Sequence, residues 1–314
     1  MNDGGRQSPT NRPDEAAQRL LHRIVSLENL RFAWNRVEDN NGRPGSDGVS
    51  VRRFERLLDA NLIALADEVL HGGYRPEPLR RFTIQMGRKR RVLQILSVRD
   101  RVLQRAALDI LSPLWEPRFL PTSFGYRPGR SLHDAVVRIV RLRDAGNIWV
   151  VDADIRDCFN RLDHAQLRQL LARRIFEPDL LRLLTSWFSP APATCGVPQG
   201  AVISPLFCNI YLHELDASLK RRRLHGVRYA DDFVILCRSE AHAEHALRAT
   251  EKILAGLKLE LNQKKTRVVS FDEGFDFLGV HFEGTDYSYT WEGKRITIDE
   301  LSPDFFYYHT DGYE

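Results

Sequence analysis

Two adjacent aspartates, Asp231 and Asp232, interrupt a run of strand-forming residues, VRYADDFVILC, over 227–237. The β-branched and aromatic residues on both sides predict two short strands that meet at the acidic pair. Neighbouring carboxylates repel one another, and burial raises the cost of keeping both charged. A divalent cation relieves both problems, and oxygen ligands favour Mg²⁺. A polar hairpin turn would also explain an isolated pair, so its meaning depends on other acidic residues.

A third aspartate follows a second buried-strand pattern. IWVVDADI (148–155) is short, apolar and rich in β-branched residues, and Asp154 lies at its end. Asp152 shares the strand face of Asp154, and we expect a structural role for it. Carboxylates that share two metal ions about 3.5–4 Å apart are the usual arrangement for phosphoryl transfer. If Asp154 meets the acidic pair in space, the chain is predicted to carry out this chemistry.

Composition excludes several classes of protein. The 314 residues are 43% hydrophobic and 28% charged, which is typical of a globular protein. The sequence has no run of the roughly 18 apolar residues that a membrane span needs. The polar start, MNDGGRQSPTNRPDE, lacks the apolar core of a signal peptide, so we expect a cytoplasmic protein without membrane contact. The four cysteines contain no CxxC pair, which argues against zinc and against disulfides.

Positive charge is concentrated locally, although the net charge is only +4. The densest clusters are RKRR at 88–91 and KRRR at 220–223. Such clusters suit a polyanion such as nucleic acid. Each alone is more often a solvated surface.

Hydrophobic periodicity indicates the order of the elements. It predicts helices near 17–34, 53–70, 98–110, 136–140, 205–220 and 243–257. A basic hairpin is expected over 79–95, and short strands are expected over 266–282. The predicted class is therefore α+β, with antiparallel strands backed by helices.

Three stretches together resemble the motifs of reverse transcriptases. VRYADDFVIL resembles the signature motif, and DADIRDCFNRLDH resembles the first palm motif, whose leading aspartate falls on Asp154. Between them, GVPQGAVISPLFCNIYLHELD resembles the motif that lines the nucleotide pocket. The resemblance implies a right-hand polymerase fold with fingers and palm. It also implies two Mg²⁺ ions, with Mn²⁺ as a substitute, at Asp154, Ile155, Asp231 and Asp232.

The resemblance also assigns roles around the nucleotide. Phe159 matches the aromatic residue that excludes the 2′-hydroxyl of a ribonucleotide, and Gln199 and Gly200 match the contact to the incoming nucleotide. Lys265, in LKLELNQKKTRV, is the expected acid that protonates the pyrophosphate; a solvated lysine is the alternative. Basic residues of the hairpin, Arg91 and Lys89, are expected to clamp the triphosphate. RVLQIL departs there from the family's usual Gly and Pro.

Further stretches resemble the group II intron lineage in particular: GRPGSDGVSV (42–51), VRDRVLQRAALDIL (98–111) and SFGYRPGRSLHDAV (123–136). In the last of these, Arg127 and Arg130 are expected to contact template phosphates, with Tyr126 available to stack. FDFLGVHF (275–282) resembles the hairpin that grips the primer, with Leu278 and Gly279 at its turn.

The resemblance suggests four segments. They are an N-terminal leader and helix (1–39), fingers interleaved with the palm (40–147), the palm (148–282) and a short tail without a full thumb (283–314). The lack of a thumb suggests a free-standing enzyme of CRISPR adaptation or antiphage defence, a subunit whose thumb comes from a partner protein or non-coding RNA, or a truncated intron enzyme. Phe305, Phe306, Tyr307 and Tyr308 are either a docking segment or a tail packed on the palm.

The leading functional hypothesis is an RNA-directed DNA polymerase that uses an RNA template, a DNA or RNA primer and dNTPs. One alternative is a defence polymerase that copies a dedicated non-coding RNA or works without an external primer. A second is a catalytically vestigial nucleic-acid-binding subunit. RNA-templated RNA synthesis is a weaker competitor because Phe159 disfavours ribonucleotides.

Overall fold

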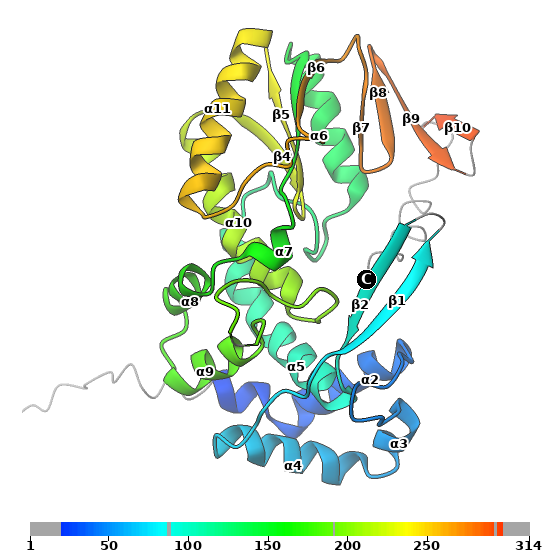
Figure 1. Ribbon diagram of the computed structural model, residues 1–314, viewed down its shortest axis with the longest axis vertical. Helices are drawn as coiled ribbons and strands as arrows, with labels where there is room; N and C mark the ends of the chain where they lie inside the picture. The colour runs from blue at the N-terminus through cyan, green and yellow to red at the C-terminus, as the bar shows by residue number, and fades with distance from the viewer. Residues whose placement is uncertain (1–19, 87–88, 191, 292–293, 298–314) are drawn as a thin grey trace, which may run out of the picture. The chain divides into compact units, whose positions relative to one another are not determined.

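A computed structural model describes residues 20–86, 89–190, 192–291 and 294–297 (Figure 1). Within these residues, contacts divide the chain into two compact units. The first unit draws on Met1–Leu111, Arg168–Pro190 and Gly200–Val202. The second draws on Ser112–Leu167, Ala191–Gln199 and Ile203–Glu314.

The first unit is mainly helical. Besides a helical stretch at 20–24, it contains α2 (Leu27–Asp39), α3 (Val51–Glu55), α4 (Leu58–Leu70), most of α5 (Val98–Trp115), the end of α8 (His164–Ala172) and α9 (Pro178–Ser186). The helix predicted over 17–34 is divided where the Ser26 hydroxyl accepts a hydrogen bond from the Asn29 N–H, 3.3 Å away. Serine at this position caps a new helix, so two helices form in place of one.

The predicted hairpin is present in the first unit. Its strands β1 (Arg80–Met86) and β2 (Lys89–Ile95) pair antiparallel, with Met86 opposite Lys89. A buried polar cluster joins three segments of the same unit, one before the hairpin and two after it in the sequence. The Tyr74 hydroxyl donates to Asp100 at 2.7 Å and accepts from the Trp187 indole at 3.1 Å.

The second unit is built around a four-stranded antiparallel sheet in the order β4-β5-β3-β6. Its strands are β3 (Trp149–Asp154), β4 (His225–Tyr229), β5 (Asp232–Cys237) and β6 (Arg267–Ser270). Helix α11 (Glu240–Gly256), with α10 (Ser204–Arg221) beside it, covers one face, and α6 (Leu132–Asp144) covers the other (Figure 1). This layering confirms the predicted α+β class.

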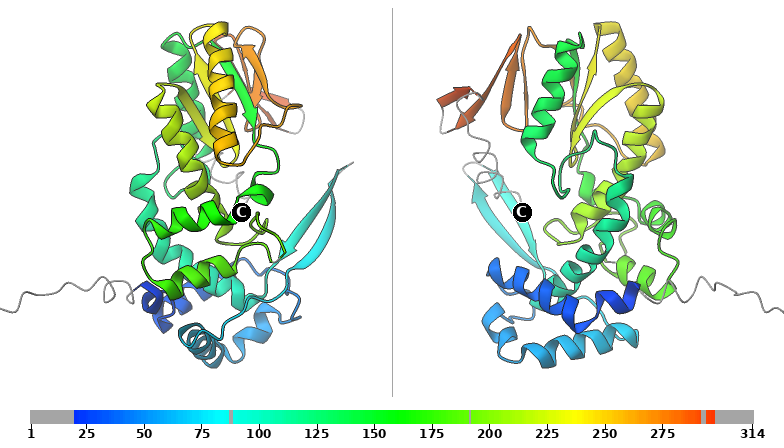
Figure 2. Two further views of the ribbon diagram at one scale, coloured as in Figure 1. Left: turned by 60° about the vertical axis from the view of Figure 1, so that its left-hand side comes forward. Right: turned by 180° about the vertical axis from the view of Figure 1, so that it is seen from behind.

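A second sheet in this unit has the order β10-β9-β8-β7. Its strands are β7 (Phe275–Phe277), β8 (Val280–Glu283), β9 (Asp286–Trp291) and β10 (Lys294–Thr297). Seen from behind, α6 lies between the two sheets (Figure 2), and its apolar side shares one core with both. Leu278 and Gly279 form the β7–β8 turn as predicted, with φ of 54° and 77°. Strands β9 and β10 lie within the tail predicted from residue 283, and Phe305–Tyr308 fall outside the described residues.

The two units are bounded differently from the predicted segments, in which 40–147 was expected to form fingers interleaved with the palm. Ser112–Leu167 belong to the second unit. The reason is spatial, because α6 packs on the β4–β5 side of the sheet through its apolar face. Conversely, Arg168–Pro190 belong to the first unit although they lie within the predicted palm range.

Two expectations from the sequence concerned membrane crossing and the cysteines. Among the described helices, none combines the length and apolarity that crossing a membrane would require. The cysteines are free thiols, with Cys195 exposed and Cys158, Cys208 and Cys237 buried.

Candidate active site

Strand pairing brings the predicted acidic residues together. Asp154 is the last residue of β3 and lies directly opposite Asp232, the first residue of β5. Residues opposite one another in adjacent strands project to the same face of the sheet, with Cβ atoms about 4.5–5.5 Å apart. Asp231 occupies the turn just before β5. The three aspartates therefore lie at one end of the two central strands of one sheet.

Asp154 has two neighbours from the loop that precedes β6. Its carboxylate accepts hydrogen bonds from the Lys265 ammonium at 2.7 Å and from the Asn262 side-chain amide at 3.0 Å. The Asn262 backbone N–H also donates to the Asp154 carbonyl at 2.8 Å. Sequence reasoning identified Lys265 but missed Asn262, whose only signal is its place in the same LNQKK stretch.

Asp231 and Asp232 are crowded by negative charge. Burial, followed by the charges of Asp154, Asp231 and Asp152, raises the pKa of Asp232 to about 7. Burial and Asp154 also raise the pKa of Asp231. Lys265 opposes both shifts, and its own pKa is raised by its hydrogen bond to Asp154. No described Lys, Arg or His forms an ion pair with Asp231 or Asp232.

The donor set suits a hard cation. The converging side chains are carboxylates, and the Lys265 ammonium already supplies one positive charge at Asp154. In the described part of the chain, no three Asp, Glu, His or Cys side chains are close enough to hold an ion as they stand. Both Asp154 oxygens are instead engaged by Lys265 and Asn262.

Asp152 lies next to this cluster and has its own partner. Across the β3–β6 pair it faces Arg267, whose Nε donates to the Asp152 carboxylate at 3.2 Å. Burial raises the pKa of Asp152, and the Arg267 hydrogen bond opposes that shift.

Phe159, Gln199 and Gly200 were expected to lie around the nucleotide. Phe159 lies in α7 (Cys158–Arg161) of the second unit, is partly buried, and accepts a hydrogen bond from the Val197 N–H at its carbonyl, at 2.8 Å. Gln199 is exposed in the same unit. Gly200 belongs to the first unit and has a φ of +90°; an added Cβ would lie 3.1 Å from the Gln94 carbonyl oxygen.

Lys89 and Arg91 both lie in β2 of the first unit, opposite Met86 and Ile84. Their side chains fall outside the described part of the structure.

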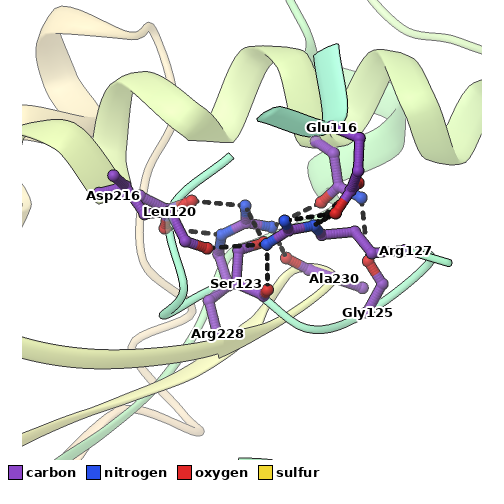
Figure 3. A network of polar contacts seen from close by, with 9 residues as sticks. Glu116, Leu120, Ser123, Gly125, Arg127, Asp216, Arg228 and Ala230 are labelled. Carbon is purple, nitrogen blue, oxygen red and sulfur yellow. Dashed lines mark hydrogen bonds and ion pairs between the residues drawn. The ribbon is translucent and has the colours of Figure 1, made fainter. Parts of the chain in front are cut away.

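Arg127 requires a correction. Its side chain is only 3% exposed. The guanidinium donates to the Glu116 carboxylate at 2.6 Å and to the carbonyls of Leu120 and Ser123 at 2.7 and 2.6 Å (Figure 3). Because these groups bury and engage the guanidinium, Arg127 stabilises its own loop and is not available to a template phosphate.

Its two predicted companions remain on the surface. Tyr126 is 42% exposed and has a positive φ of 57°. Arg130 is exposed, and its guanidinium carbon lies 5.7 Å from the centre of the Phe124 ring.

Another arginine was missed by sequence reasoning. Arg228, in the VRYADD stretch, is the largest fully buried side chain among the described residues. Its guanidinium binds Asp216, which lies in α10. Both occur inside quoted motifs, but no pattern distinguishes them from exposed charged residues.

Comparisons with known proteins agree with these motifs. A family model described as reverse transcriptase (RNA-dependent DNA polymerase) matches residues 85–282. Protein YkfC of Escherichia coli K12 is 34% identical over 317 aligned residues, which cover 85% of this chain and 83% of that protein. The group II intron-encoded protein LtrA of Lactococcus lactis is 28% identical over 271 residues, covering 81% of this chain but only 45% of LtrA.

A solved structure shows the same type of fold. The telomerase of Candida albicans, in complex with a fragment of telomeric RNA, matches with a TM-score of 0.52 and 15% identity. The match covers 78% of this chain and 50% of the telomerase chain.

Proposed function

This chain belongs to the reverse transcriptase family, and we propose that it extends a DNA or RNA primer on an RNA template using two Mg²⁺ ions bound at Asp154, Asp231 and Asp232. Its enzyme class is RNA-directed DNA polymerase. The observation that carries the proposed metal site is the Asp154–Asp232 pair on adjacent strands, beside Asp231, for which the described residues supply no ion-pair partner.

The chain's own residues support this site in three ways. The paired strands β3 and β5 supply a rigid base for the carboxylates. The Lys265 ammonium lies 2.7 Å from the Asp154 carboxylate, where a bound cation would take over its positive charge. At the end of β3 and just after it, the chain bonds to the segment 260–262: the Asn262 N–H donates to the Asp154 carbonyl, and the Arg156 N–H donates to the Glu260 carbonyl. These bonds point away from Asp232. By the alternation of strand backbone, the intervening Ile155 carbonyl faces the acidic side.

Bound divalent ions would activate the primer 3′-hydroxyl and stabilise negative charge on the triphosphate and pyrophosphate. Mn²⁺ is a chemically reasonable substitute for Mg²⁺, because both accept oxygen ligands. Lys265, once released from Asp154, is the proposed proton donor to the pyrophosphate.

The remaining contacts complete the proposal. Phe159 excludes ribonucleotides, Gln199 and Gly200 contact the incoming nucleotide, and Arg91 with Lys89 binds its triphosphate. Arg130 and Tyr126 bind the template, and the Leu278–Gly279 turn contacts the primer. Exposure of Arg130 and Tyr126 and the tight β7–β8 turn are compatible with these roles.

Primer extension on an RNA template with dNTPs and Mg²⁺ tests the metal assignment. We expect Asp231→Asn and Asp232→Asn to lower the extension rate by on the order of 10³-fold or more, because each removes a charge that holds the ions. Asp272→Asn, at an exposed aspartate outside the site, is the matched control and should retain full activity. Unchanged extension by both site variants would show that the metal assignment is wrong.

The steric role of Phe159 has a separate test. Phe159→Ala removes the ring and should increase ribonucleotide incorporation while DNA synthesis persists. The measurement is the ratio of rates with rNTPs and dNTPs on the same primer. An unchanged ratio would remove Phe159 from this role without affecting the metal assignment.

The finer part of the proposal concerns the pathway. It is a cytoplasmic role in CRISPR adaptation or antiphage defence, with a partner protein or non-coding RNA, for a chain that resembles the group II lineage over 42–51, 98–111 and 123–136. Nucleic acid that copurifies with the protein from cells should then include a recurrent RNA and DNA complementary to it. A random sample of cellular RNA would contradict a dedicated template.

A further inference from the structure

Arg228 lies in β4 of the second unit, just before the acidic turn in the sequence. Its side chain is 2% exposed, and that of Asp216 is 3% exposed. The Arg228 guanidinium donates to both oxygens of the Asp216 carboxylate, at 2.8 and 2.6 Å (Figure 3). A bidentate pair of this kind fixes the plane of the guanidinium as well as its position.

The other N–H groups of the Arg228 guanidinium reach three further residues. They donate to the Ala230 carbonyl at 2.7 Å, to the Asn209 side-chain oxygen at 3.0 Å and to the Ser123 hydroxyl at 2.8 Å. Together with the two bonds to Asp216, these contacts use every N–H of the guanidinium. Lysine could not reproduce the planar arrangement, because its ammonium is a compact point charge.

The contact to Ala230 connects this network to the site. Ala230 has a φ of +58°, in the left-handed region that a residue with a Cβ rarely adopts. It immediately precedes Asp231 in the chain, so its backbone conformation determines the direction in which the acidic pair leaves β4. A hydrogen bond from a rigid, buried guanidinium holds this unfavourable conformation in place.

The loop at 122–125 supports the same turn from a second direction. The backbone N–H of Arg228 donates to the Thr122 carbonyl, and the backbone N–H of Phe124 donates to the Arg228 carbonyl, both at 2.8 Å. A Cβ added to Gly125 would lie 2.4 Å from the Ala230 nitrogen. The Gly125 carbonyl is in turn held by the Asn209 amide at 2.9 Å. This loop therefore packs on the turn backbone itself.

Charge alone does not account for the arrangement. Asp216 balances the charge of Arg228, and Arg228 influences the pKa of Asp231 less than burial, Asp154 and Lys265 do. Buried ion pairs often stabilise no better than well-packed apolar residues. The feature that an apolar substitute could not provide is the directed bond to Ala230.

We propose that Arg228 is a positioning residue that holds Ala230 in its left-handed conformation and thereby places Asp231 and Asp232 relative to Asp154. Asp216, Asn209 and Ser123 orient the guanidinium. The inference rests on the proposed role of these aspartates in DNA synthesis.

The test compares Arg228→Lys with the wild type in primer extension and in thermal unfolding. Arg228→Lys keeps the buried charge beside Asp216 but loses the simultaneous bond to Ala230. We expect a folded protein whose kcat is lower by on the order of 10- to 100-fold, the size of effect that small misplacement of reacting groups produces. The Mg²⁺ concentration for half-maximal rate should rise, while the KM for the primer–template should stay unchanged.

Ser123→Ala provides a milder variant that removes only a hydroxyl bonded to the guanidinium. It should show the same pattern, a lower kcat and a higher Mg²⁺ requirement, with a smaller amplitude. Wild-type kcat and Mg²⁺ dependence in folded Arg228→Lys would overturn the inference. If Arg228→Lys does not fold, the same wild-type behaviour in Ser123→Ala would overturn it.

Asp232→Asn, measured in parallel, separates this result from failure of the proposed function. Inactive Asp232→Asn together with fully active Arg228→Lys rejects the positioning role only. Fully active Asp232→Asn rejects the metal assignment on which the inference depends.

Discussion

Two groups of charged side chains adjoin the acidic turn and differ in how their charges are balanced. The front consists of Asp154, Asp231, Asp232 and Lys265, and the back consists of Arg228 and Asp216. On the front, Asp231 and Asp232 face Asp154 and share the influence of Lys265, whose side chain is 64% exposed. On the back, the Nε and one terminal nitrogen of the buried Arg228 guanidinium bind the two oxygens of the Asp216 carboxylate, and each N–H of that guanidinium has an acceptor. The two sides are separated by only a few residues of β4 and the turn.

This difference shows which part of the fold is held rigidly, around Arg228, and which part keeps repelling carboxylates close together, around Asp232. The fully paired back stabilises one backbone conformation, since a buried polar network that is completely bonded is rigid. On the front, burial and then repulsion from the neighbouring aspartates raise the pKa of Asp232 to about 7. A cation that binds there gains attraction to carboxylates whose positions are already determined, as preorganised sites require.

The largest effect is expected at Lys265, on the front. Lys265→Met removes the proposed acid and should lower kcat by about 10²–10⁴-fold, the usual contribution of a positioned proton donor. It also removes the ammonium bound to Asp154, so the Mg²⁺ concentration for half-maximal rate should fall. Lys264→Met, at the exposed neighbour, is the control. An unchanged kcat would assign Lys265 to charge balance alone.

On the back, Asp216→Ala leaves Arg228 buried without its counter-charge. Breaking one side of a buried ion pair should lower the free energy of unfolding by about 3–5 kcal/mol. Urea unfolding followed by circular dichroism measures this change. Glu244→Ala, which breaks the exposed pair with Arg248, should change stability by less than about 1 kcal/mol. Equal effects of the two variants would contradict the contrast between buried and exposed pairs.

Gly125 tests the close approach of the loop to the turn. In Gly125→Ala the new Cβ meets backbone atoms of Ala230 and Tyr229, at 2.4 and 3.0 Å. Such crowding should destabilise the protein by about 1–3 kcal/mol and lower the extension rate, because the turn must move. Gly256→Ala has open space around the added atom and should be neutral or stabilising by up to about 1 kcal/mol. A neutral Gly125→Ala would show that the loop adapts without displacing the turn.

The smallest effect is expected at His213 in α10, whose ring lies 6.0 Å from that of Phe119. Burial lowers the pKa of His213, and Arg228 and Arg118 act in the same direction while Asp216 and Glu214 oppose it. The folded pKa is thus below the unfolded one, so stability present above about pH 6.5 decreases as the pH falls toward the folded pKa.

His213→Gln should flatten this dependence, by at most ~1.4 kcal/mol per pH unit. The measurement is the urea concentration at the unfolding midpoint, for the wild type and for His213→Gln. It is made from about pH 5 to about pH 8, the range in which histidine titrates. Parallel curves for the two proteins would contradict a lowered pKa of His213 in the folded state.

Local patterns in the sequence were sufficient for several elements and for the acidic residues. Alternating and β-branched residues located β3, β4 and β5, and the acidic pair between two strand patterns located the turn. They could not predict the break at Ser26 or the division at Ser112, because capping and packing compete with periodicity.

Tertiary structure alone decided which polar residues serve the turn. Asn262 reaches Asp154 across 108 residues of sequence, and Ser123 reaches Arg228 across 105. In sequence, Arg127 and Arg228 look like any other basic residues, and a basic residue is usually exposed. Whether such a side chain binds a phosphate or holds a turn depends on which acceptors surround it after folding. That arrangement is set by contacts between distant segments, which no local pattern contains.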